Sequence, residues 1–147
     1  MNYEVPRSIA DNFGAPIQEL LKLINLVNQP GVNNNELTID FSNCQFASSF
    51  HLGVIAMLLW KSSRGELPVG ISIRGVNNPS VKSYFDTINF PSCYDAESSV
   101  GFINEYFKHY ASRTYIPIVK FPANSYGLNS NIREKLLEAA VRLFKNN

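Results

Sequence analysis

The sequence has 147 residues, of which 45% are apolar and 17% are charged, so we expect one folded domain with at most a short appendage. Thirteen Lys and Arg residues against twelve Asp and Glu residues give a net charge of +1, which argues against nucleic acid as a partner. The two cysteines, Cys44 and Cys93, form no CxxC pair, so neither a disulfide-rich secreted domain nor a zinc site is indicated.

The N-terminal residues contain no basic stretch followed by a long apolar run, so no secretory signal is visible. The most apolar run, Leu52–Trp60, is about half as long as the ~20 residues that span a bilayer. We therefore expect no membrane partner, and a protein that works in a reducing cytoplasm.

The apolar spacing after Ala15-Pro16 predicts an amphipathic helix that is stopped by Pro30-Gly31. Its apolar residues recur at helical intervals and are Ile17, Leu20, Leu21, Ile24 and Val27. Apolar and polar residues then alternate over Glu36–Phe41, which predicts a strand.

The middle of the chain predicts a second helix, a second strand and a third helix. Phe46-Ala47 is expected to be extended, and the apolar segment Phe50–Ser62 predicts a largely buried helix. A strand is predicted over Val69–Arg74. The third helix begins near Ser80 and places four residues on one face, namely Val81, Tyr84, Phe85 and Ile88.

The last third predicts a helix over Glu97–Ser112, a strand over Tyr115–Phe121 and a helix over Asn131–Lys145. Pro117 removes one hydrogen-bond donor from the predicted strand, which favours the edge of a sheet. Strands separated by helices favour an α/β fold with mostly parallel strands, because parallel neighbours need crossover connections.

Motifs of common enzyme classes do not occur in the sequence. His51 and His109 have no second ligand at metal-binding spacing, and there is no GxGxxG, GxxxxGK[ST], GxSxG or HExxH. We therefore expect no metal, no cofactor and no catalytic activity.

The segment Leu37–Ile55 resembles the core of the STAS family (sulfate transporter and anti-sigma factor antagonist). In that family a strand is followed by a loop, an apolar residue, Asp-Ser-Ser-Gly-Leu-Gly and a helix. The matching positions in this chain are Phe46 for the apolar residue, then Ser48, Ser49, Phe50, His51, Leu52 and Gly53. The resemblance continues through Ile73–Val76 and Ile88–Phe90, so that it covers roughly residues 36 to 110, about half of the chain.

The resemblance implies an α/β fold in which residues 1–112 form a STAS-like mostly parallel or mixed sheet flanked by helices. Residues 113–147 would add a strand and helix. This extension resembles the connector that precedes histidine-kinase-type ATPase domains in some bacterial regulators, and it would either lead to a further domain or cover the domain's own sheet.

The function implied by the resemblance is regulatory and non-catalytic. Anti-sigma factor antagonists bind a histidine-kinase-type ATPase, in trans or in cis, and exchange partners in signal transduction that controls transcription. The implied partner-binding residues are Ser48, Ser49, Phe50, His51, Asn77 and Asn78.

The sequence departs from the family at the phosphoacceptor, because Phe50 occupies the position of the second serine. Ser49 is then a displaced phosphoacceptor, or else Ser48 or Ser49 caps the following helix. Two other functions stay open. The first is an intramolecular sensor or scaffold domain that binds a nucleotide or small ligand and regulates an adjacent ATPase. The second is a small hydrolase using Ser49 and His51, whose two-residue spacing is unfavourable on a helix.

Overall fold

The computed structural model describes residues 1–9, 14–29, 36–95, 118–120, 134 and 141. The chain divides into two compact units, Met1–Asp86 and Thr87–Asn147. The boundary that we predicted between residues 112 and 113 lies outside the described residues.

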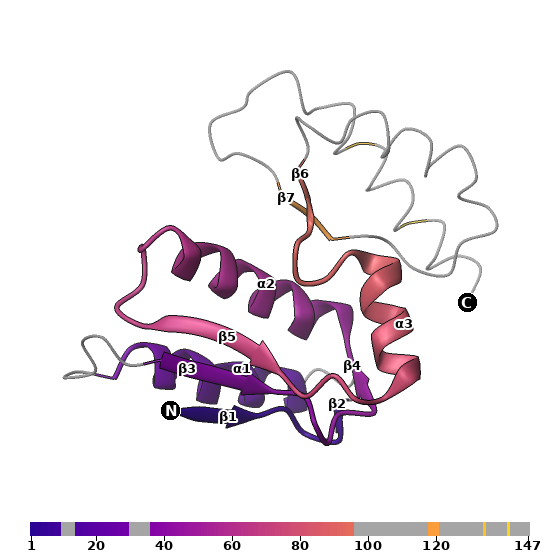
Figure 1. Ribbon diagram of the computed structural model, residues 1–147, viewed down its shortest axis with the longest axis horizontal. Coiled ribbons are helices and arrows are strands. Elements are labelled where there is room, and N and C mark those ends of the chain that lie inside the picture. The colour runs from indigo at the N-terminus through magenta and orange to yellow at the C-terminus, as the bar shows by residue number, and fades with distance from the viewer. Residues whose placement is uncertain (10–13, 30–35, 96–117, 121–133, 135–140, 142–147) are drawn as a thin grey trace. The chain divides into compact units, whose positions relative to one another are not determined.

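The first unit contains a three-stranded parallel sheet in the order β1 (Asn2–Glu4), β3 (Glu36–Asp40) and β5 (Gly70–Arg74). The crossover helices are α1 (Gly14–Val27) and α2 (Ser49–Ser63). In Figure 1 the arrows of β3 and β5 point the same way, and α2 runs back beside β5. The predicted α/β class with parallel strands is confirmed.

Alternation along the strands gives this sheet two different faces. Tyr3, Leu37 and Ile39 are buried beneath the helices, and we call this side the covered face. The polar side, which we call the open face, includes two rows that run across all three strands. These rows are Asn2, Thr38 and Ser72, and Glu4, Asp40 and Arg74.

Both crossover helices lie on the covered face, because successive right-handed crossovers in one direction place their helices on the same side. Contact between α1 and α2 agrees with this arrangement. The helix predicted after Ala15-Pro16 is confirmed as α1, but the residues that it buries are Leu20, Leu23 and Val27. Three of the apolar residues in the predicted stripe are exposed instead: Ile17, Leu21 and Ile24.

The predicted second and third helices are confirmed as α2 and α3 (Pro79–Ile88). α2 has no single apolar stripe, and it buries His51 together with Leu52, Ile55, Ala56 and Leu58. α3 packs on the core through Phe85, whose ring meets Phe41 edge-on with centroids 5.1 Å apart.

Two short strands near the N-terminus were not predicted. They are β1 and β2 (Ser8–Ile9), and β2 pairs in parallel with β4 (Phe46–Ala47). Segments of two or three residues carry no usable alternation, so only their pairing with predicted extended segments defines them.

In the second unit, β6 (Tyr94–Asp95) pairs in parallel with β7 (Val119–Lys120), which lies within the strand predicted over Tyr115–Phe121. The helix predicted over Glu97–Ser112 lies outside the described residues. Of the last predicted helix, Glu134 and Val141 are described, and both are helical.

Candidate functional site

The first turn of α2 is fixed by a serine cap. Ser48 has extended backbone angles, and its hydroxyl oxygen accepts a hydrogen bond from the His51 backbone N–H at 3.3 Å. The Ser48 carbonyl also accepts the Leu52 N–H at 3.0 Å. Of the two capping residues considered above, Ser48 is therefore the cap, and Ser49 is an exposed first residue of the helix.

This turn separates the predicted binding residues into an exposed pair and a buried pair. Phe50 is 60% exposed, and Ser49 is also exposed. Ser48 and His51 are buried, so they shape the turn without presenting their side chains at the surface. Phe46, two residues before the cap, is 45% exposed and adds a second aromatic ring at this surface.

The His51 ring lies inside the covered face, stacked on Tyr3 with centroids 6.4 Å apart. Neither ring nitrogen has a hydrogen-bond partner among the residues that the structure describes. Burial lowers the pKa of His51 to about 4, although the nearby Glu19 carboxylate opposes this shift. The imidazole is therefore neutral at pH 7.

Glu19 on α1 joins the neighbouring Tyr3 to the helix. The Tyr3 hydroxyl donates to Glu19 Oε2 at 3.3 Å, and burial followed by the Glu19 charge raises the pKa of Tyr3. The buried His51 ring thus lies close to a phenol and a carboxylate that are bonded to each other.

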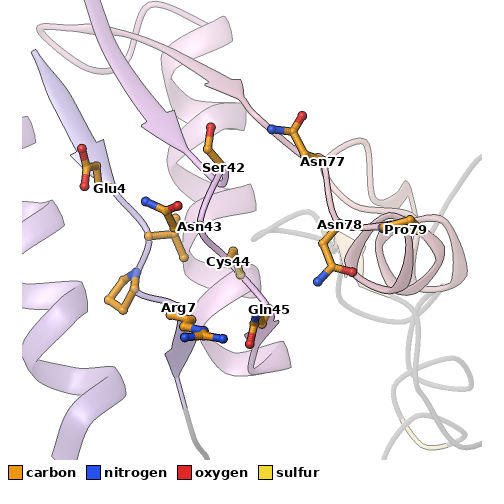
Figure 2. Close-up of a pocket in the computed structure, with 11 residues that line it drawn as sticks. Glu4, Arg7, Ser42, Asn43, Cys44, Gln45, Asn77, Asn78 and Pro79 are labelled. Atoms are coloured by element: carbon orange, nitrogen blue, oxygen red, sulfur yellow. The ribbon is translucent and has the colours of Figure 1, made fainter.

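The loops that follow β1, β3 and β5 surround an open pocket of about 820 Å³ (Figure 2). These loops lie at one edge of the sheet, because the strands are parallel and their carboxyl ends coincide. The pocket is lined by Glu4, Val5, Pro6, Arg7, Ser42, Asn43, Cys44, Gln45, Asn77, Asn78 and Pro79.

A compact polar network holds the β3 and β5 ends of this edge together. Asp40 Oδ1 accepts the Ser42 N–H at 2.9 Å and the Ser42 hydroxyl at 2.5 Å, while Asp40 Oδ2 receives Arg74 Nη2 at 2.8 Å. The Ser42 hydrogen bonds, followed by Arg74, lower the pKa of Asp40. Gly75 has a φ of +74°, and a methyl group there would overlap Ser42 Oγ. Glycine is therefore required for this packing.

A backbone hydrogen bond ties two of these loops together, and a side-chain hydrogen bond fixes the third at the start of α3. The Arg7 carbonyl accepts the Gln45 N–H at 2.7 Å, and Asn78 Oδ1 accepts the Ser80 N–H at 2.9 Å at the start of α3. Of the predicted loop residues, Asn77 is exposed and Asn78 is half-buried.

Sequence reasoning missed Arg7, Asn43 and Gln45 as site residues. Asn43 and Gln45 follow the predicted strand β3, so the sequence already placed them after a strand, whereas Arg7 follows β1, which was not predicted.

The described residues include no group of three His, Cys, Asp or Glu side chains placed to hold a metal ion. Burial raises the pKa of the Cys44 thiol. Within the described ranges, no helix combines the length and apolar character that crossing a bilayer requires.

No known protein family, curated protein or solved structure matches this chain. Functional assignment therefore depends on its own residues and on their arrangement.

Proposed function

We propose that this chain is a non-catalytic regulatory domain that binds another protein through the exposed start of α2. Its partner is a histidine-kinase-type ATPase, as for the anti-sigma factor antagonists that Leu37–Ile55 resembles, and it acts in the bacterial cytoplasm in the control of transcription. The STAS-like arrangement of the sheet and helices is part of this proposal.

The observation that carries the proposal is the exposure of Phe50 on a rigid turn. A phenyl ring that is 60% exposed leaves apolar area in water, while the Ser48 cap and the buried His51 prevent the turn from hiding it. Aromatic rings held in a fixed orientation are favoured at protein interfaces because little conformational entropy is lost on binding.

Further apolar side chains extend this surface along α2. Met57 is 47% exposed and lies about two turns after Phe50 on the same face of α2. Trp60 is 42% exposed and lies about one turn further along, with the Arg64 guanidinium 4.9 Å from its ring centroid. Phe46 lies just before the helix. A partner that covers Phe46, Phe50, Met57 and Trp60 would bury three aromatic side chains and one sulfur-containing side chain.

Ser49 is the phosphoacceptor in this proposal. Its side chain is exposed directly beside Phe50, so a phosphate there would add negative charge to an apolar contact. Phosphorylation is therefore expected to release the ATPase.

The test is affinity capture from a bacterial lysate with residues 1–147 as bait, quantified by mass spectrometry. Phe50→Ala should reduce recovery of the histidine-kinase-type ATPase by about tenfold or more, as expected for an aromatic anchor. Leu21→Ala is the matched control, because Leu21 is an apolar residue 53% exposed on the other helix.

Thermal melts of both variants should match that of the wild-type chain, since neither side chain is buried. Equal capture of the ATPase by the two variants, or no capture of such an ATPase by the wild-type chain, would contradict the proposal.

A further inference from the structure

We propose that the pocket at the carboxyl ends of β1, β3 and β5 binds a purine nucleoside monophosphate, with Arg7 holding the phosphate. This inference goes beyond the docking role of α2, because it concerns a small ligand and a different set of side chains. Asn77 and Asn78, which the family resemblance places among the partner-binding residues, line this pocket together with Arg7.

The location is the first argument. Binding residues are concentrated on loops that a rigid scaffold positions, and the loops after these parallel strands converge at one edge of the sheet. All three loops at this edge contribute to the pocket, and its volume of about 820 Å³ is that of a nucleotide-sized site.

The charged lining is the second argument. Arg7 is the one Arg or Lys that lines the pocket, and among the described residues it forms no ion pair. A guanidinium presents two parallel donors to phosphate oxygens. Glu4 lines the pocket on the other side of Asn43 in Figure 2, where a carboxylate would accept hydrogen bonds from ribose hydroxyls. One cation and one anion suit a monophosphate better than a polyphosphate.

The carboxamides are the third argument. Four of the lining residues are Asn or Gln, and each side chain offers a paired donor and acceptor that can match the edge of a purine. Asn78 Oδ1 already accepts the Ser80 N–H, which leaves its NH₂ group as a donor toward the ligand. Pro6 and Pro79 add apolar surface for the faces of the base.

The experiment is calorimetric titration of the full chain with AMP and GMP, using adenosine and inorganic phosphate as partial ligands. At least one nucleotide should bind, and both partial ligands should bind about tenfold or more weakly than that nucleotide. Arg7→Gln should weaken nucleotide binding by about tenfold or more, because it removes the charge-assisted hydrogen bonds. Gln45→Ala should weaken it by a smaller factor.

Arg64→Gln is the matched control, since Arg64 is the C-cap of α2 and does not line the pocket. Equal nucleotide affinity in Arg7→Gln and Arg64→Gln, or no binding of either nucleotide by the wild-type chain at millimolar concentration, would overturn the proposal. Phe50→Ala should bind the nucleotide normally. Phe50→Ala therefore tests the two proposals independently, because loss of ATPase binding need not affect nucleotide binding, and loss of nucleotide binding need not affect ATPase binding.

Discussion

The two faces of the β1-β3-β5 sheet differ in whether Asp40 on one face and His51 on the other have hydrogen-bond partners. On the open face, Asp40 is paired with Arg74 and receives two hydrogen bonds from Ser42. On the covered face, the buried His51 ring has no hydrogen-bond partner for either nitrogen among the described residues. Charge is thus satisfied where water is available, and an unsatisfied polar group lies where water is excluded.

This difference shows where the stability of the first unit originates. The covered face is stabilised by apolar burial and carries one costly polar group, whereas exposed ion pairs such as Asp40 with Arg74 contribute little. Three measurements test this difference between the two faces.

The largest effect is expected from truncating the covered face. Ile39→Ala should lower the free energy of unfolding by about 2–5 kcal/mol, because it removes a fully buried side chain and leaves a cavity. Thr38→Ala, one position along the same strand but on the open face, should change it by less than about 1 kcal/mol. Urea unfolding of both variants measures the difference, and similar losses would show that the two faces are not distinct.

The second effect is a loss of stability in mild acid. The pKa of His51 falls from 6.5 to about 4 on folding. Between pH 6.5 and pH 4, His51 is therefore protonated in the unfolded chain but neutral in the folded chain. Unfolding free energy should therefore decrease by up to about 3 kcal/mol as the pH falls from 6.5 to 4. Urea unfolding at several pH values across this range measures the decrease. In His51→Leu this decrease in unfolding free energy should be absent.

Asp40 provides the comparison for the open face. Its pKa is lowered below 3.8 on folding, so its contribution is complete above pH 3.8 and is lost as the pH falls through the folded value. Asp40→Asn should leave the change between pH 6.5 and 4 intact. A wild-type stability that is constant between pH 6.5 and 4 would refute the burial of a neutral His51.

The smallest of the three effects concerns the end of β5. Gly75→Ala should lower the unfolding free energy by roughly 1–3 kcal/mol, because alanine is strained at a positive φ and its methyl group would meet Ser42 and Asp40. Gly65→Ala has a similar φ of +69° but open space around the added methyl group. Urea unfolding should show a larger loss of unfolding free energy in Gly75→Ala than in Gly65→Ala, and the difference measures the cost of crowding against Ser42 and Asp40. Equal losses would indicate that backbone strain alone is involved.

The sequence predicted the long elements of the first unit because their signals are local. Alternation over Glu36–Phe41 gives β3, and helical spacing gives α1 and α3. The buried side of α1 was not predictable in the same way. Its apolar residues cover more than one face, and only packing selects Leu23 over Leu21.

The candidate site was predictable only in part, for the same reason. Phe50 and Asn77 were identified from a resemblance along the chain, whereas Arg7 and Gln45 meet through a strand pairing between distant segments. Burial of His51 beside Tyr3 also depends on β1, which is too short to be recognised from its own three residues.

The two buried cysteines can report on local opening of the structure through their reactivity. Cys44 belongs to the first unit and Cys93 to the second, both are buried, and burial raises the pKa of each thiol. Thiolates are the reactive form, so neither sulfur is reactive toward an alkylating reagent while its surroundings stay closed. The alkylation rate of each cysteine therefore measures how often the surroundings of that sulfur open, without any label added to the chain.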